Sequence, residues 1–135
     1  MAPSLARLTA AAALAAAVVF LLVAPAARAN DDPDPWFGRD KALHFSASAI
    51  IAAGSYGVAR VGFDDPRPCL LIAGSVAIAA GAGKELYDLS GRGDASWRDL
   101  TWDAIGTATG LLVAWAVDRS ITWWLQPPAR APASP

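Results

Sequence analysis

The stretch SWRDLTWDAIGTATGLLVAWAVDRSITWW, residues 96–124, carries the clearest structural pattern of this chain. Ser96 is followed three residues later by Asp99, a spacing typical of a capping box at the start of a helix. Small and acidic residues then recur every three or four positions and so share one helix face: Asp99, Asp103, Gly106, Gly110 and Ala114. The stretch therefore predicts a helix over residues 97–124 whose inward face is small and acidic.

Two further helices are expected before this stretch. Residues 42–59 carry no charge and match the ~18 residues that a membrane-spanning helix requires. A second helix is expected from Pro66 to about Leu89, because Asp65 is suited to cap it and proline is favoured at a first helical position. Gly91 then breaks it, together with a second glycine two residues later.

The glycines predict how the last two helices pack. Gly106 and Gly110 have the spacing that lets two backbones approach closely in lipid. Gly74 and Gly81 lie on one face of the second helix, and that face continues to Lys84 and Asp88. We therefore expect this face to pack against the small and acidic face of the third helix.

Composition places the chain at a membrane. Its 135 residues include 55% hydrophobic residues and 11 glycines, so apolar residues plus glycine make up about 63%, above the roughly 45–50% of soluble domains. The 11 Lys and Arg residues are balanced by 12 Asp and Glu residues, which excludes a basic nucleic-acid-binding protein. One cysteine and one histidine exclude an intramolecular disulfide and a Cys/His zinc module.

Tryptophans give a second indication of a membrane. Trp102 and Trp123 are 21 residues apart, which corresponds to about 31 Å of helix and to the ~30 Å hydrocarbon thickness. Trp97 and Trp124 lie beside them, so two aromatic belts are expected. The alternative is a small soluble bundle, because the charge-free runs of the second and third helices are only ~15 residues long.

The N-terminus resembles a targeting segment. An apolar run over residues 8–24 follows a short region with one positive charge, and small residues occupy both Ala27 and Ala29. We expect a signal peptide over residues 1–29 that is cleaved after Ala29, with an uncleaved signal anchor as the alternative; either places Asn30 outside the cytoplasm. The three-helix domain then covers residues 30–125, and a disordered Pro/Ala tail covers residues 126–135.

Short connections make consecutive helices antiparallel, so the start of the first helix, the end of the second and the start of the third lie at the same end. This gathers the unusual polar residues, which we call the polar rim: Asp40, Lys41, His44, Lys84, Glu85, Asp88, Arg92, Asp99 and Asp103. Because the chain leaves its signal segment with Asn30 outside, the polar rim is expected to face the periplasm or its equivalent.

Three roles for the polar rim follow from its chemistry. Placing a carboxylate inside or at the edge of a membrane costs free energy, so such residues are functional candidates by default. The catalytic candidates are His44, Glu85, Asp88 and Asp103. Asp88 and Asp103 are expected to be close neighbours, so that one is a proton donor and the other a proton acceptor. His44 is expected to be a base near them. The other two roles are structural, as caps and ion pairs, and the binding of a ligand or partner. Neither a metal nor a cofactor is expected, since no ligand spacing such as HExxH occurs.

The rim motifs resemble those of a known family. Read in order, Asp40-Lys41-x-x-His44-Phe45, Gly83-Lys84-Glu85-x-Tyr87-Asp88 and Gly93-x-x-Ser96-Trp97-x-Asp99-Leu100-x-x-Asp103-x-x-Gly106 are similar to the YfiM-like family of bacterial envelope proteins and, more distantly, to the VanZ-like membrane proteins. The resemblance implies a small helical envelope protein whose activity is not established. In two respects the chain departs from these families: no cysteine follows the signal segment for lipid attachment, and Asp88 and Asp103 stand where VanZ-like proteins carry an amide.

The sequence thus predicts an all-α protein with three antiparallel, membrane-embedded helices, located in the inner membrane or on its periplasmic side. Its expected function is non-enzymatic, with the polar rim fixing the fold and binding an envelope protein or a lipid head group. Membrane lipids are the expected partners, and nucleic acid is not. The alternative is a hydrolase or transferase that acts on a lipid-linked or cell-wall substrate by acid/base or metal-assisted chemistry. In this alternative Asp88 or Glu85 is the base, His44 is its proton partner, and Lys84 or Arg92 holds an anionic group.

Overall fold

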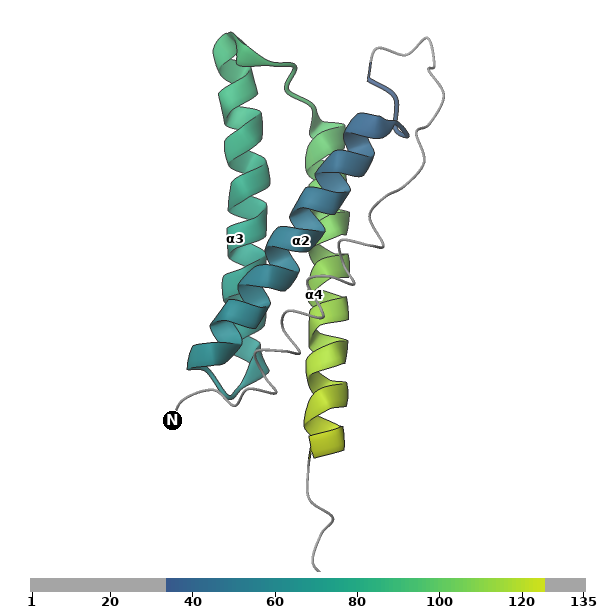
Figure 1. Cartoon of the computed structure of the whole chain (residues 1–135). Helices are drawn as coiled ribbons and strands as arrows, with labels where there is room; N and C mark the ends of the chain where they lie inside the picture. Colours follow the sequence, from purple (N-terminus) through teal and green to yellow (C-terminus); the bar gives the residue numbers. More distant parts are fainter. Residues whose placement is uncertain (1–33, 126–135) are drawn as a thin grey trace, which may run out of the picture.

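The computed structural model describes residues 34–125, and in this range it is all-α, with three long helices and no strand. The helices are α2 (Arg39–Gly62), α3 (Pro66–Tyr87) and α4 (Trp97–Leu125), and a short π-helical turn, η1 (Asp88–Arg92), follows α3 (Figure 1). The predicted fold class is confirmed. The expected signal segment and C-terminal tail lie outside the described residues.

The connections follow the predicted local chemistry. Asp65 caps α3, since its carboxylate accepts a hydrogen bond of 3.0 Å from the backbone N–H of Arg67, and Pro66 occupies the first turn. At the other end α3 stops at Tyr87, two residues before the expected boundary, because the chain widens into η1 there. Gly91 has φ +84° within η1, a left-handed conformation that glycine adopts without steric penalty, so the helix is broken at the predicted glycine.

The start of α2, the end of α3 and the start of α4 lie at the same end of the molecule, as predicted (Figure 1). Consequently α2 and α4 run parallel to each other and α3 runs antiparallel to both. Helix α2 lies across the other two and packs most extensively on α4. This arrangement brings residues from all three helices together at the end where the polar rim was expected.

The glycine pair of α4 packs against a different partner from the one predicted. A Cβ atom added at Gly106 or Gly110 would overlap the backbone carbonyl of Phe45 or Ala49, respectively, so both glycines approach α2 rather than α3. The face of α3 does meet α4, but through side chains, since a Cβ at Gly81 would lie 2.6 Å from the Asp103 carboxylate. The closest approach of two backbones therefore joins the parallel pair α2 and α4.

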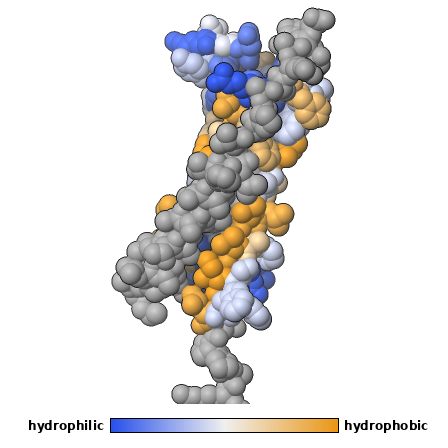
Figure 2. Space-filling view, turned by 45° about the vertical axis from the view of Figure 1, so that its right-hand side comes forward, coloured by the Kyte–Doolittle hydropathy of each residue, from blue (hydrophilic) through white to orange (hydrophobic). Residues whose placement is uncertain are grey.

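Large apolar side chains lie mainly on the outside of the helices. The buried core consists of small residues, chiefly alanines, together with Cys69 and Tyr56. Leu71 and Val58 are each 74% exposed, and many other large aliphatic and aromatic residues of the three helices are exposed as well. Figure 2 shows hydrophobic residues along the body of the visible described face, a large group of hydrophilic residues at the upper end and a smaller group at the lower end.

Each of the three helices is long and apolar enough to cross a membrane. A water-soluble bundle buries its large apolar side chains, whereas a bundle in lipid exposes them and packs through small residues. The distribution in this protein is of the second kind. It indicates membrane association rather than the small soluble bundle considered above.

Candidate functional site: an enclosed network of charged residues

Asp99, in the first turn of α4, is the centre of the polar rim. Its side chain is only 2% exposed and contacts basic residues from both other helices. The Lys41 ammonium of α2 lies 2.5 Å from Oδ1, while the Lys84 ammonium of α3 lies 3.7 Å from Oδ2. His44 of α2 places Nε2 3.6 Å from the same Oδ2. One carboxylate thus joins α2, α3 and α4.

Asp103 lies one turn further along α4 and binds α2. Its Oδ2 is 3.1 Å from Nδ1 of His44, and its Oδ1 accepts a hydrogen bond of 2.7 Å from the Ser48 hydroxyl. Gly81 of α3 leaves room for this carboxylate because it has no side chain. The two nitrogens of the His44 ring therefore face two different aspartates, so the ring lies between them in the interface of α2 and α4.

Lys84 connects the end of α3 to the network. Its ammonium lies 2.9 Å from Asp88, the pairing predicted from their spacing of four residues, and 3.1 Å from Glu85. Both carboxylates are buried. Gly93 is required beside Asp88, since a Cβ at this glycine would overlap the Asp88 carboxylate.

The serine half of the predicted capping box at the start of α4 is present, but the reciprocal hydrogen bond to Asp99 is not. The Ser96 hydroxyl accepts hydrogen bonds from the backbone N–H groups of Arg98, at 3.1 Å, and Asp99, at 3.3 Å. The reciprocal bond comes from elsewhere, because Oε2 of Glu85 accepts the backbone N–H of Ser96 at 2.6 Å. Asp99 is thereby left to pair with the lysines, and the end of α3 caps the start of α4.

Asp34 belongs to this site although the sequence did not identify it. It accepts a short hydrogen bond from the Lys41 ammonium and a 2.7 Å hydrogen bond from the Ser96 hydroxyl. The bond from Lys41 is the main reason that the pKa of Asp34 lies below its ordinary value, and the bond from Ser96 acts in the same direction. No spacing could have revealed this role, because Asp34 and Ser96 are far apart in the chain.

This contact predicts a pH dependence. The pKa of Asp34 is lower in the folded than in the unfolded state, so its contribution to stability is present above about pH 4 and disappears as the pH falls below that value. We expect Asp34→Asn to lower Tm at pH 6 in detergent, and the difference from wild type to shrink towards pH 3. Asp94→Asn, at an exposed turn residue, is the control and should leave Tm unchanged at both pH values. An Asp34→Asn deficit that stays constant between the two values would contradict this assignment.

Two predicted rim residues lie at the edge of the network or outside it. The Asp40 side chain is 64% exposed and contacts Lys41 at 3.3 Å. Arg92 is exposed, donates a hydrogen bond of 2.9 Å to the Ser90 hydroxyl and lies over the ring of Tyr87. Asp88 and Asp103, which were expected to be close neighbours, each have partners of their own: Asp88 pairs with Lys84, and Asp103 contacts His44 and Ser48.

One group of three residues has the composition of a metal site. Ligand atoms of Asp40, His44 and Asp99 lie within 4.8 Å of one another. The Lys41 ammonium, however, lies 2.5 Å from Asp99 and 3.3 Å from Asp40. A cationic side chain of the protein therefore already neutralises these carboxylates, and the donor set does not fit a resident divalent ion.

A second polar cluster joins α2 and α4 at the opposite end. The Tyr56 hydroxyl donates a hydrogen bond of 2.9 Å to Asp118, and Arg60 lies 3.1 Å from the same carboxylate. Arg60 also donates to the backbone carbonyls of Phe63 and Asp64, at 2.5 and 2.6 Å. The sequence analysis missed this cluster, although an aspartate in the apolar second half of the helix was a signal that could have revealed it.

Comparisons of this chain with protein families, with curated proteins and with solved structures give no match. The fold and the site alone define its class. In residues 34–125 it has three helices of the membrane-associated type, with an enclosed network of charged residues at one end.

Proposed function

We propose that this chain is a non-enzymatic protein of the bacterial cell envelope, embedded in the inner membrane with its polar rim on the periplasmic side. The enclosed network holds the three helices in one arrangement, and the exposed edge of the rim binds a lipid head group or an envelope partner. The orientation depends on the signal-like N-terminal sequence, and the envelope setting agrees with the resemblance to the YfiM-like family.

The observation that carries this proposal is that the network is enclosed and internally paired. Lys41, Glu85, Asp88, Asp99 and Asp103 are all more than nine-tenths buried. The first four each contact a partner of opposite charge, and Asp103 contacts His44 and Ser48. Breaking a buried ion pair by removing one partner is strongly destabilising, so the main role of such residues is to stabilise the fold.

The exposed edge has the chemistry for binding at the membrane surface. Lys84, in the last turn of α3, is 42% exposed, and Arg92, the last residue of η1, is also exposed. Trp97, the first residue of α4, is 63% exposed, and tryptophan is favoured at the level of the lipid head groups. A cationic side chain near an anionic membrane surface contributes about 1 kcal/mol to binding.

The alternative of acid/base chemistry has less support. A general base must lie within hydrogen-bond reach of the proton that it removes from a substrate. Glu85 accepts the backbone N–H of Ser96, Asp88 pairs with Lys84, and both are buried. Their contacts are with the protein itself.

Two variants test the proposal, one for the structural role of the network and one for lipid binding by its exposed edge. His44→Ala is expected to lower the amount of protein in the membrane fraction and its Tm, because it leaves Asp103 without its base. Arg92→Gln is expected to leave both unchanged while reducing the affinity of the detergent-solubilised protein for phosphatidylglycerol about fivefold, with phosphatidylcholine as the reference lipid. A His44→Ala protein with normal abundance and Tm would overturn the structural role of the network, and unchanged binding by Arg92→Gln would exclude this arginine as a head-group contact.

A further inference from the structure

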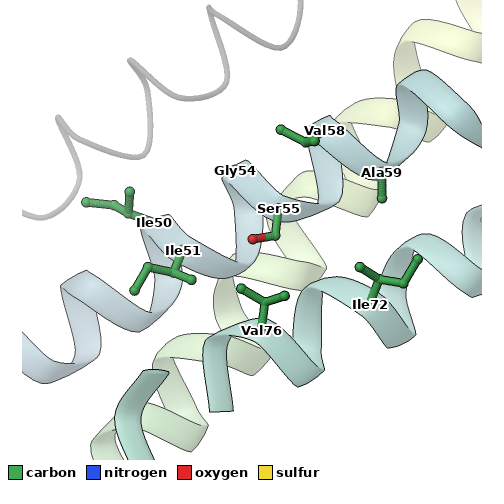
Figure 3. Close-up of a pocket in the computed structure, with 8 residues that line it drawn as sticks. All are labelled: Ile50, Ile51, Gly54, Ser55, Val58, Ala59, Ile72 and Val76. Atoms are coloured by element: carbon green, nitrogen blue, oxygen red, sulfur yellow. The ribbon is translucent and has the colours of Figure 1, made fainter. Parts of the chain in front are cut away.

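An apolar groove lies on the outer side of α2 and α3, away from the charged network. It is lined by positions between Ile50 and Ala59 of α2 and by Ile72 and Val76 of α3 (Figure 3). Ser55 is the one lining residue with a polar side chain, so the groove presents an apolar surface to a hydrophobic occupant.

The shape of the groove suits a helix. Gly54 lies among the lining residues, and a Cβ added there would have no atom within 4 Å. Its neighbours Ile50 and Val58 are exposed on either side, one helical turn away. A glycine between two exposed aliphatic side chains forms a notch, and helices in lipid pack closely where small residues meet.

We propose that the groove is occupied by the chain's own residues 8–24, retained as a fourth helix that packs on α2 and α3. This takes the alternative in which residues 1–29 stay attached as a signal anchor instead of being cleaved after Ala29. The three described helices would then form part of a four-helix arrangement.

The length and composition of the preceding chain fit this occupant. Residues 8–24 are apolar and as a helix would span about 26 Å. A connection of only 14 residues, 25–38, separates them from α2, and helices joined by short connections run antiparallel. Gly54 lies 15 residues after the start of α2, about 22 Å along the helix, which corresponds to about residue 9 counted back from Ala24, directly before residues 10–13. Residues 10–13 are four alanines, small enough to approach the notch.

Disulfide cross-linking of the full-length chain in native membranes tests the proposal. Gly54→Cys is combined in turn with cysteine at Ala10, Ala11, Ala12 and Ala13, which together sample every side of a helix. Leu112→Cys, exposed on α4, replaces Gly54→Cys in the control series, and Gly54→Cys alone controls for the native, buried Cys69. The intact mass of the same preparation shows whether residues 1–29 are present.

The expected result is a chain of full length with an intramolecular cross-link from Gly54→Cys at one or two of the four alanine positions and none from Leu112→Cys. A mature N-terminus at Asn30 would overturn the proposal. So would full-length protein without a cross-link, or with equal cross-linking in both series. Cross-links between two chains would assign the groove to a second copy instead.

Discussion

Asp99→Asn is expected to lower the free energy of unfolding by about 3 kcal/mol, because it removes the one carboxylate that pairs with lysines from two other helices. The neutral amide cannot balance the buried ammonium of Lys41, which lies 2.5 Å from Oδ1 in the native protein. The measurement is an unfolding titration in detergent micelles followed by circular dichroism.

Asp40→Asn is the matched control for this experiment. Asp40 also contacts Lys41, but its side chain is 64% exposed, and exposed ion pairs contribute only about 0–1 kcal/mol. The two variants change the same chemical group beside the same lysine and differ mainly in burial. Equal losses from both would show that the enclosure of Asp99 has no energetic consequence and would contradict the role given to the network.

Gly110→Ala is expected to be destabilising by about 3 kcal/mol, since one methyl group would overlap the backbone carbonyl of Ala49. The obstacle is backbone rather than a flexible side chain, so α2 and α4 must move apart along the most extensive of the interfaces between the described helices. Unfolding in micelles measures this loss, and proteolysis of native membranes shows whether the helix pair has opened.

Gly83→Ala, in α3, is expected to have the opposite effect on the free energy of unfolding. A Cβ at Gly83 has no atom within 4 Å, and replacing an exposed helical glycine with alanine stabilises a helix by up to about 1 kcal/mol. The sign of the effect therefore distinguishes a glycine needed for close packing from one that is not. A destabilising Gly83→Ala would mean that this position contacts another molecule in the membrane.

The three helices were predictable because their signals are local. The charge-free run over residues 42–59, the cap at Asp65 and the face shared by Asp99 and Gly110 each depend on residues within one helix. The gathering of the polar rim followed from the antiparallel rule alone, since short connections leave few arrangements.

The pairings were less predictable because they depend on how the helices rotate and cross. The sequence predicted that Asp88 and Asp103 lie at the same end, but in the structure Asp88 pairs with Lys84, whereas Asp103 contacts His44. It likewise could not show that Glu85 rather than Asp99 accepts the Ser96 N–H, since both are acidic residues near the start of α4. Periodicity identifies the face of a helix, whereas contacts between faces are set by packing.

The position of the charged network near the ends of its helices has a consequence for membrane insertion. Lys41 and His44 lie in the first two turns of α2, Asp99 and Asp103 in the first two turns of α4, and Lys84 in the last turn of α3. Each helix can therefore enter the bilayer with the ionised groups of this network still hydrated at the water boundary. The groups lose that water only when the helices associate laterally, so the ion pairs form as the separately inserted helices assemble.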